Sequence, residues 1–339
     1  MHDNRISLIT GESIDRALDG KQRAIIDRIR DAYLAFARGK SCLPHSTFVT
    51  FEESSPDRII ALPAYLGGDR EVAGIKWISS IPSNDARGLD RASAIIAIND
   101  RVTGRVKAVM EGSIISAKRT AASAALAASH LHRDKGVSGV GLVGLGLIGL
   151  ETVRFLREEF PSIGRIHAHD IDRSRFDRFA DTCRRLWPGI EVIFAERAID
   201  ALSASTLGIL ATTAKTPHIE SLEGVSDDAV ILHLSLRDLA PEIILACNNV
   251  ADDVDHVCRA RTSVHLAFDR VGNTDFIVGL VDAIEDPGSY RKRQAPTIFS
   301  PFGLGVLDMA LADMVLDEIG TSADAVVEEF YPPHWASRM

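Results

Sequence analysis

The sequence predicts an α/β protein built from two parts of different pattern. Between residues 47 and 110, short apolar runs alternate with turn-like clusters, which is typical of strands in an antiparallel or mixed sheet. From residue 138 onward, strand-like and helix-like segments alternate, which is typical of a parallel sheet covered by helices. A glycine-rich loop, Gly144-x-Gly146-x-x-Gly149, joins the first strand of this second part to its first helix.

The composition limits the class of protein before any motif is considered. The chain has 339 residues, of which 46% are hydrophobic, and this is typical of a globular protein with a large core. The net charge of −9 argues against a nucleic-acid or anionic-membrane partner. Met1–Arg5 lacks the apolar run of a signal peptide, and the four cysteines form no CxxC pair. We therefore expect a cytoplasmic protein with reduced thiols and no metal site.

The first part begins with a predicted helix over residues 12–38, where apolar residues recur at helical spacing. Strands are expected at residues 47–51, 58–63, 72–78, 92–99 and 106–110, because each is a short apolar run bounded by turn-like residues. An alanine-rich helix is expected over 113–132, since alanine has the best helix propensity.

In the second part we expect strands at residues 138–143, 165–169, 191–194, 207–212 and 229–234, with helices over 150–160 and 173–187. A last amphipathic helix is expected over 306–319, followed by an irregular tail over 331–339. Consecutive strands separated by helices favour parallel pairing with right-handed crossovers.

The glycine loop has the context of a dinucleotide-binding site. Gly144 would make the tight turn, Gly146 would admit the pyrophosphate, and Gly149 would allow the helix to pack on the strand. Leu147 and Ile148 lie in the loop that leads into the helix expected over 150–160, whose free N–H groups favour phosphate. Asp170 ends the next strand and would bind the ribose 2′-hydroxyl, which favours NAD over NADP, although Arg173 and Arg175 lie close by. The alternative is a tight turn in a domain that binds no nucleotide.

Three charged residues stand out, and each has an ordinary alternative. Lys76 interrupts an apolar strand, so it either points to solvent or meets a substrate carboxylate. Arg119 lies in the alanine-rich helix and is either a carboxylate ligand or a surface residue, while its neighbour Lys118 is expected at the surface. Asp238 follows a strand of the second part and is either a general acid–base group or a loop residue. The 11 histidines show no metal-binding spacing.

Several motifs together make the chain resemble the ornithine cyclodeaminase/μ-crystallin family over nearly its whole length. They are Gly74-Ile75-Lys76-Trp77, the run from Ala108 to Ser113 that leads to Lys118-Arg119-Thr120-Ala121-Ala122-Ser123, the glycine loop, Asp170, Ala211-Thr212-Thr213, and Ser300-Pro301-Phe302-Gly303-Leu304-Gly305 with Asp308. The resemblance implies a Rossmann NAD-binding domain over 119–305, inserted in a substrate-binding and dimerisation domain formed by 1–118 and 306–339. It also implies a homodimer.

The resemblance further implies roles for individual residues. Lys76 and Arg119 match the family residues that hold the substrate α-carboxylate, and Asp238 matches the catalytic aspartate. Lys76 is also expected to take part in catalysis. Thr120, Thr212 and Gly303 match positions at the dinucleotide, alongside the glycine loop and Asp170.

The departures from the family pattern indicate a particular branch. Ile60 stands where ornithine cyclodeaminases have a glutamate for the distal amine, and Arg91 stands where the family often has threonine. A first-domain arginine is missing, which leaves His45 as the basic candidate there. The absence of the amine-binding glutamate and the presence of the cation Arg91 suggest a substrate with more than one carboxylate. The strings around Arg58, Lys76 and Glu111 resemble the branch that makes 2,3-diaminopropionate for siderophores and peptide antibiotics.

This branch implies an NAD-dependent enzyme that oxidises N-(2-amino-2-carboxyethyl)-L-glutamate at its CH–NH bond and releases 2-oxoglutarate and L-2,3-diaminopropionate. Two enzyme alternatives stay open: an ornithine cyclodeaminase, and an imine reductase or amino-acid dehydrogenase using NAD or NADP. A third alternative is a non-catalytic binding protein of the μ-crystallin kind, although such a protein needs no general base at Asp238.

Overall fold

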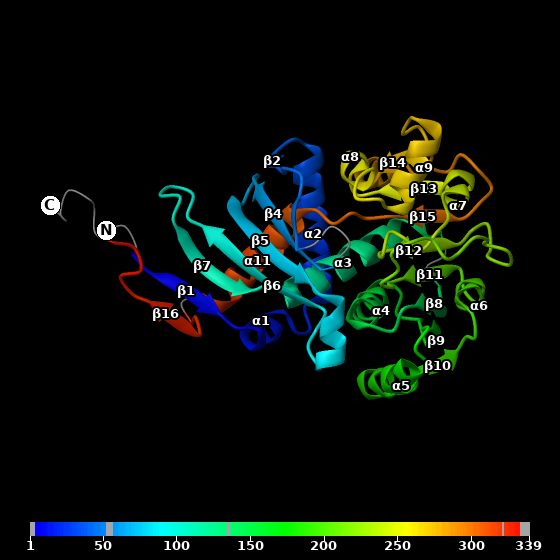
Figure 1. The fold of residues 1–339 in the computed structure, drawn as a ribbon, viewed down its shortest axis with the longest axis horizontal. Helices are drawn as coiled ribbons and strands as arrows, with labels where there is room; N and C mark the ends of the chain where they lie inside the picture. The colour runs from blue at the N-terminus through cyan, green and yellow to red at the C-terminus, as the bar shows by residue number, and fades with distance from the viewer. Residues whose placement is uncertain (1–3, 52–56, 134–135, 321, 333–339) are drawn as a thin grey trace. The chain divides into compact units, whose positions relative to one another are not determined.

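The computed structural model describes residues 4–51, 57–133, 136–320 and 322–332. The chain divides into two units, each described here by itself (Figure 1). Unit 1 comprises residues 1–119 and 304–339, and unit 2 comprises residues 120–303. Within the described ranges, no helix has the length and apolar character needed to cross a membrane.

Unit 1 is built on a mixed sheet, as the strand-like runs predict. Its strand order is β16-β1-β7-β6-β5-β4-β2, with β3 paired to β4. β1 pairs with β7 in parallel, and the other pairs are antiparallel. The strands are β1 (Ile6–Ile9), β2 (Ser41–Cys42), β3 (Thr47–Thr50), β4 (Arg58–Leu66), β5 (Val72–Ser80), β6 (Ala92–Asn99), β7 (Val106–Glu111) and β16 (Ala325–Val327).

Helices cover one face of this sheet. α2 (Gln22–Ala37) and α11 (Gly305–Ile319) pack against each other and against β4, and α1 (Gly11–Leu18) packs on α11. A 3₁₀ turn, η1 (Pro82–Arg87), joins β5 to β6. The expectation of one helix over 12–38 is wrong, because Gly20 adopts a left-handed φ of 69° and separates α1 from α2.

α3 (Ser113–Leu131) carries the chain from unit 1 into unit 2. The Glu111 carboxylate accepts hydrogen bonds from the backbone N–H groups of Ser113 and Ile114, at 2.6 and 3.1 Å, and so satisfies two free donors of the first turn. The alanines of the helix are buried at 0–3% exposure, which explains why small residues fill it.

Unit 2 contains a wholly parallel sheet with the strand order β10-β9-β8-β11-β12-β15-β13-β14. Its strands are β8 (Gly139–Val143), β9 (Arg165–His169), β10 (Glu191–Phe194), β11 (Leu207–Leu210), β12 (Val230–His233), β13 (Asn248–Ala251), β14 (Ile277–Gly279) and β15 (Thr297–Phe299). Its helices are α4 (Leu147–Glu159), α5 (Ser174–Leu186), α6 (Ala198–Ser203), α7 (Pro241–Ala246), α8 (Val254–Val257), α9 (Ser263–Val271) and α10 (Leu280–Glu285). The prediction of a parallel α/β sheet is confirmed.

The parallel arrangement places the chemistry-bearing loops of unit 2 at one edge. The segments after β8, β9, β11 and β12 contain Gly144, Asp170, Thr212 and Asp238, respectively. Because the carboxyl ends of parallel strands meet at the same edge of a sheet, these residues share that edge. α4 begins at Leu147, three residues before the expected start at residue 150, so the last glycine of the loop is already helical.

Candidate active site

The glycine loop of unit 2 has the geometry that a bound pyrophosphate requires. Gly144 has a φ of 96°, and a Cβ there would lie 2.4 Å from the Ala211 carbonyl oxygen. A Cβ on Gly149 would lie 2.6 Å from the Gly144 oxygen, so glycine permits the close packing of α4 on the loop. Gly146 differs, because a Cβ there would meet no atom within 4 Å. The space beside Gly146 therefore remains open to a ligand.

Asp170 ties this loop to the neighbouring strand. Its Oδ2 accepts a hydrogen bond from the Leu145 N–H, and its Oδ1 accepts one from the Asp172 N–H, both at 2.9 Å. A carboxylate has about four acceptor positions, so capacity remains for a ribose hydroxyl. The two nearby arginines have other contacts: Arg173 stacks 3.5 Å from the Phe194 ring centroid, and Arg175 pairs with Asp172 at 3.5 Å.

A cavity of about 290 Å³ lies beside the loop, within unit 2. Leu147, the first residue of α4, is among its lining residues and is 56% exposed. The cavity is lined by Leu145, Gly146, Leu147, Leu150, Arg175, Arg178, Phe179 and Thr182. The glycine geometry, the acidic residue at the strand end and this hollow fit a dinucleotide.

Asp238 is the centre of a second polar cluster in unit 2. Its side chain has no exposed surface, and it follows β12 as predicted. Oδ1 accepts hydrogen bonds from the Thr212 hydroxyl and from His218 Nε2, the latter at 3.1 Å. Oδ2 accepts one from the Ser235 hydroxyl and lies 3.2 Å from His233 Nε2. Burial opposes ionisation, but the hydrogen bond from His218, the adjacent His233 ring and the hydrogen bond from Ser235 outweigh it and hold the pKa of Asp238 far below its usual range.

In unit 1, Lys76 and Arg119 meet at one carboxylate. Lys76 Nζ forms an ion pair with Asp308 Oδ2 at 2.8 Å and donates to the Ser116 hydroxyl at 3.1 Å. Arg119 Nε donates to Asp308 Oδ1 at 3.1 Å. Both cations are buried, which resolves the alternatives that the sequence left open in favour of paired interior positions. The expectation for Lys118 is wrong, since it is 5% exposed and pairs with Asp15.

This cluster perturbs the ionisation of Lys76. Burial lowers its pKa, Asp308 raises it and Arg119 lowers it, and the result is about 8 against an ordinary value of 10.5. Two cations share one carboxylate, so the cluster carries one uncompensated positive charge while Lys76 is protonated. Such a charge in a buried place favours an anionic ligand.

A family model described as ornithine cyclodeaminase/mu-crystallin matches residues 17–323. The chain belongs to this family. It is 32% identical, over 74% of its length and 75% of the relative's, to the N-((2S)-2-amino-2-carboxyethyl)-L-glutamate dehydrogenase of Staphylococcus aureus. It is 26% identical, over 91% of its length and 94% of the relative's, to the alanine dehydrogenase of Archaeoglobus fulgidus.

Two solved structures share the fold. The Δ1-pyrroline-2-carboxylate reductase of Thermococcus litoralis, in complex with NADH and L-proline, matches with a TM-score of 0.83 and 24% identity, over 93% of this chain and 97% of that one. An archaeal alanine dehydrogenase dimer with bound NAD matches with a TM-score of 0.83 and 24% identity, over 96% of this chain and 99% of that one.

Four other expected residues lie outside the two clusters. Arg91 comes directly before β6. Ile96 of β6 is the cross-strand partner of Lys76, and Arg91 precedes Ile96 by five residues. Arg91 therefore lies about 16 Å from Lys76 along the strand direction. Thr120 is half-buried on α3. Gly303 has a φ of 92°, and its N–H donates to buried Asp252, whose pKa is raised by burial to about 6. His45 is exposed.

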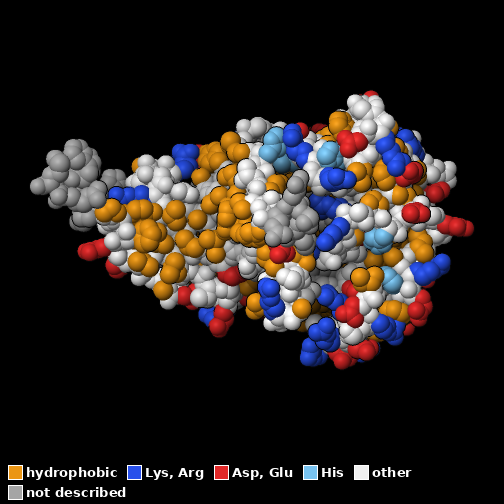
Figure 2. Space-filling view, viewed as in Figure 1, with side chains coloured by type: hydrophobic (Ala, Val, Ile, Leu, Met, Phe, Trp, Pro, Cys, Tyr) orange, Lys and Arg blue, Asp and Glu red, His pale blue; other side chains and the backbone are white. Residues whose placement is uncertain are grey.

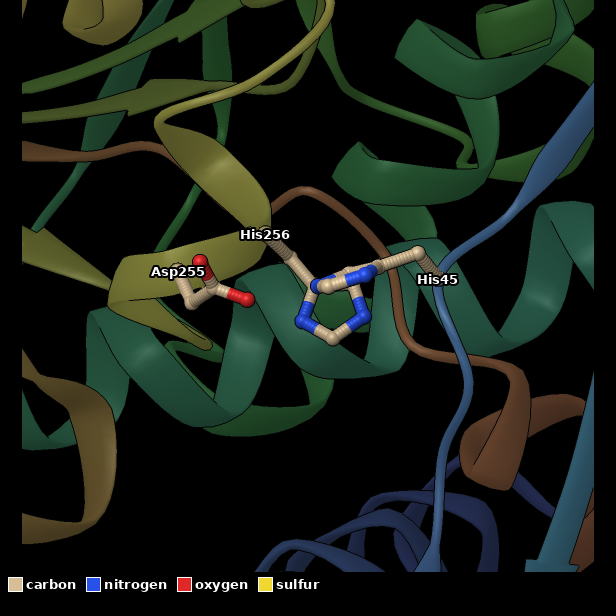
Figure 3. Close-up of side chains that lie close together, drawn as sticks. All are labelled: His45, Asp255 and His256. Carbon is tan, nitrogen blue, oxygen red and sulfur yellow. The ribbon is translucent and has the colours of Figure 1, made fainter.

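His45 lies in the irregular segment between β2 and β3 of unit 1. Figure 3 draws the side chain of His45 and those of Asp255 and His256, which belong to α8 of unit 2. Because these residues belong to different units, we assign them no common site. His256 Nδ1 lies 2.8 Å from Asp253 Oδ1, within α8's own first turn.

Two residues of interest were missed by sequence reasoning. Arg58 opens β4, and its register opposite Ser80 places it on the same sheet face as Leu62, the partner of Lys76. Its Nε is buried and has no hydrogen-bond partner among the described residues. His218, the other residue, follows Pro217 in the irregular segment after β11. Its position beyond the carboxyl end of a parallel strand was the signal that could have found it.

Proposed function

We propose that this protein is an NAD-dependent oxidoreductase that cleaves N-(2-amino-2-carboxyethyl)-L-glutamate to 2-oxoglutarate and L-2,3-diaminopropionate. The 32% identical relative from Staphylococcus aureus carries the name of a dehydrogenase for this compound. The observation that carries the proposal within this chain is the buried Lys76–Asp308–Arg119 cluster, because its extra positive charge suits a substrate carboxylate.

The glycine loop and Asp170 are the residues that would hold NAD. The N–H groups at the start of α4 would face the pyrophosphate, Gly146 would leave room for it, and Asp170 would accept from a ribose hydroxyl. Thr120, Thr212 and Gly303 are proposed to complete the nucleotide site. NAD⁺, when bound, supplies the acceptor for the hydride of the substrate Cα–H.

The chain's own residues then position and hydrolyse the substrate. Lys76 and Arg119 bind the α-carboxylate of the glutamate moiety and fix the orientation of its Cα–H, which is most of what hydride transfer requires of a protein. Oxidation of the CH–NH bond gives an imine. Asp238 orients the water that adds to the imine carbon, and the resulting carbinolamine separates into the oxo acid and the amine.

A second substrate carboxylate needs a second cation. Arg91 is the residue that the family comparison suggests. Arg58 is a further candidate, because it shares the sheet face of Lys76, burial lowers its pKa, and its Nε has no hydrogen-bond partner among the described residues. A half-buried guanidinium is costly unless an anion accompanies it, and a substrate carboxylate would supply one.

We also propose that the protein works as a homodimer that pairs through the open face of the unit 1 sheet. Trp77 and Ile95 are cross-strand neighbours on this face and are 40% and 49% exposed. The adjacent row contains Leu8, Val109, Ala97 and Ile75. Figure 2 shows hydrophobic side chains gathered over this sheet. An apolar patch of this kind favours a protein partner, and the archaeal alanine dehydrogenase with the same fold is a dimer.

One assay tests the reaction. The protein is incubated with NAD⁺ and the glutamate adduct, and the absorbance of NADH is followed while 2-oxoglutarate and 2,3-diaminopropionate are quantified. We expect all three products in equal amounts. Proline and ammonia from ornithine without net NADH would point to a cyclodeaminase, and NADH from alanine alone would point to an amino-acid dehydrogenase.

Tight nucleotide binding without turnover of any amine would overturn the proposal in favour of a binding protein. An Asp238→Asn variant tests the role of the carboxylate, and we expect it to keep its NAD affinity and lose turnover. The siderophore or peptide-antibiotic pathway and the cytoplasmic location stay predictions.

A further inference from the structure

The hydrogen-bond partners of the Asp238 carboxylate differ in chemistry and in exposure. The carboxylate itself has no exposed surface, and His233, which lies behind it, has none either. The His218 side chain is 40% exposed while its Nε2 donates to Asp238 Oδ1. Among the described partners of Asp238, His218 is therefore the ionisable group that also reaches solvent.

The hydrogen bonds determine which nitrogen of His218 carries the proton. An ionised carboxylate can only accept, so Nε2 must be the protonated nitrogen of the neutral ring. Nδ1 then keeps its lone pair, and no hydrogen bond joins it to another described residue. His218 is thus held with a free basic nitrogen directed away from Asp238.

His233 has the opposite arrangement. Its Nε2 accepts a hydrogen bond from the Asp238 backbone N–H at 3.2 Å, so its proton lies on Nδ1, which is 3.3 Å from the Ser300 hydroxyl. Both nitrogens of this buried ring are engaged within unit 2. His233 therefore supports the loop that carries Asp238 and has no free nitrogen for proton exchange.

The backbone fixes His218 against Asp238. The N–H groups of His218 and Ile219 both donate to the Asp238 carbonyl oxygen at 2.9 Å, and the Ala240 N–H donates to the Ile219 oxygen at 2.9 Å. This short parallel bridge joins the segment after β11 to the segment after β12. The imidazole is consequently placed by main-chain bonds as well as by its own contact with the carboxylate.

We propose that His218 is the group that takes up and returns the proton during hydrolysis of the imine, and that Asp238 acts as its positioning residue. This inference rests on the proposed function and sharpens it, since it divides between two residues a role that Asp238 alone would otherwise fill. An aspartate that orients an imidazole and stabilises its charged form is a recurrent arrangement in hydrolytic sites.

Hydrolysis of the imine moves two protons through His218. The oxygen of water bonds to the imine carbon while His218 Nδ1 takes one proton from that water. His218 returns this proton to the substrate nitrogen, which becomes the leaving amine. The carbinolamine O–H then gives its proton to Nδ1, the C–N bond breaks as the carbonyl of 2-oxoglutarate forms, and His218 passes this second proton to the departing nitrogen, which leaves as a primary amine. No electrons are transferred in these steps, because the oxidation precedes them.

The charges around the pair agree with this division of roles. The low pKa of Asp238 makes that carboxylate a weak base at neutral pH, whereas imidazole ordinarily exchanges protons between pH 5 and 8. Among the described contacts of the pair, the other ionisable group is His233, the last residue of β12, which lies 3.2 Å from Asp238. Lys215 and Glu220 lie on the same segment as His218.

The kinetic test compares His218→Asn with a matched control, His265→Asn. His265 lies on α9, and its Nε2 is 3.6 Å from Asp269, so the control removes another imidazole next to a carboxylate. We expect His218→Asn to lower kcat by about 10²- to 10⁴-fold and to abolish the fall in rate at acid pH, while NAD affinity is kept. The control should retain both kcat and the pH profile. His218→Ala should regain activity with added imidazole.

A result in which His218→Asn keeps the wild-type acid limb of the pH profile would overturn the inference. The inference would also be overturned if the His218 variants lost kcat together with a fall in melting temperature and added imidazole did not restore the activity, because this combination indicates a structural role.

A second measurement needs no substrate and separates this inference from the proposed function. Nitrogen chemical shifts of labelled histidine should report a neutral His218 protonated at Nε2. In Asp238→Asn the downfield chemical shift of the His218 Nε2 proton should decrease, because an amide oxygen is a weaker acceptor than a carboxylate. An unchanged proton shift would refute the pairing even in an active enzyme. Absence of turnover with a changed proton shift would reject the proposed reaction and keep the pair.

Discussion

Lys76 Nζ and Asp308 Oδ2 lie 2.8 Å apart in unit 1, on side chains that are 1% and 0% exposed. Lys76 comes from β5 and Asp308 from α11, so a strand near the start of the chain and a helix near its end form one charged pair. Gly74, on the same face as Lys76, makes the approach possible, because a Cβ there would lie 3.0 Å from the Met309 sulfur.

Asp308→Asn should destabilise the protein strongly. The substitution would leave Lys76 and Arg119 buried side by side without a carboxylate, and losing one partner of a buried pair costs about 3–5 kcal/mol. Asp317→Asn on the same helix is the control, since its pair with Arg70 is about half exposed and should contribute no more than about 1 kcal/mol. Urea unfolding of both variants measures the difference. Equal midpoints would show that Asp308 does not stabilise the cations.

Substrate binding should weaken above pH 8. Lys76 is charged below its pKa of about 8 and loses that charge as the pH rises through it, so its attraction for a carboxylate disappears there. We expect KM to rise steadily between pH 8 and 10 while kcat at saturation changes less. In Lys76→Arg the guanidinium stays protonated, and the rise should vanish provided that thermal unfolding shows a folded variant. A flat KM in the unaltered protein contradicts the assignment.

Gly146→Ala should impair NAD binding without impairing the fold. The added methyl would meet no protein atom within 4 Å but would occupy the open space beside the loop. We expect an unchanged melting temperature and an NAD Kd raised by about tenfold or more, as calorimetry can measure. Gly164→Ala is the control, because its methyl would make ordinary contact at 3.9 Å and should leave the Kd unchanged. An equal Kd in both variants would remove the loop from the nucleotide site.

Arg58→Met and Arg91→Met should separate the two candidates for the second substrate carboxylate. Arg58 shares the face of Lys76, so its loss should raise KM for the glutamate adduct roughly tenfold to a hundredfold, the usual range for a charged hydrogen bond. The effect of Arg91→Met should be smaller. Steady-state kinetics of the two variants measures both effects. A larger rise of KM in Arg91→Met than in Arg58→Met would assign the second carboxylate to Arg91, as the family comparison suggests.

Ile95→Glu should dissociate the proposed dimer. The side chain is 49% exposed, so the monomer can carry a charge there, whereas a buried interface cannot accommodate two of them without cost. Val102→Glu is the control, because Val102 lies in the turn after β6 and is 89% exposed. Sedimentation should give half the mass for the first variant and an unchanged mass for the second. A monomeric unaltered protein would rule out the pairing.

The parts that sequence reasoning predicts well are those whose signal is local. The glycine loop and the five strands from β8 to β12 depend on neighbours in the chain, whereas the strands β13 to β15 and the helices α6 to α10 were not predicted. β1 and β16 went unpredicted because they are short and pair with each other across most of the chain's length. The break at Gly20 was overlooked because the helical spacing of apolar residues continues on both sides of it.

The candidate site shows the same limit. A lone lysine in an apolar strand cannot reveal its counter-charge when that charge lies in the last helix. Nor does the sequence around Arg58 reveal that its Nε is buried with no hydrogen-bond partner in the part of the chain that the structure describes. Lys118 was expected at the surface because adjacent residues on a helix usually face different ways. Instead its side chain is buried and forms an ion pair with Asp15. The role of His218 depends on a bridge between two loops, which no local spacing encodes.

The pairing of Asp308 with Lys76 and Arg119 has a consequence for how the protein is synthesised. Asp308 follows Arg119 by 189 residues in the sequence. Lys76 and Arg119 therefore leave the ribosome long before Asp308 has been synthesised. Unit 2 has all its strands once residue 299 has emerged, whereas unit 1 must wait for α11. We expect the nascent chain to fold its middle first and its beginning last, with the early strands as a target for chaperones.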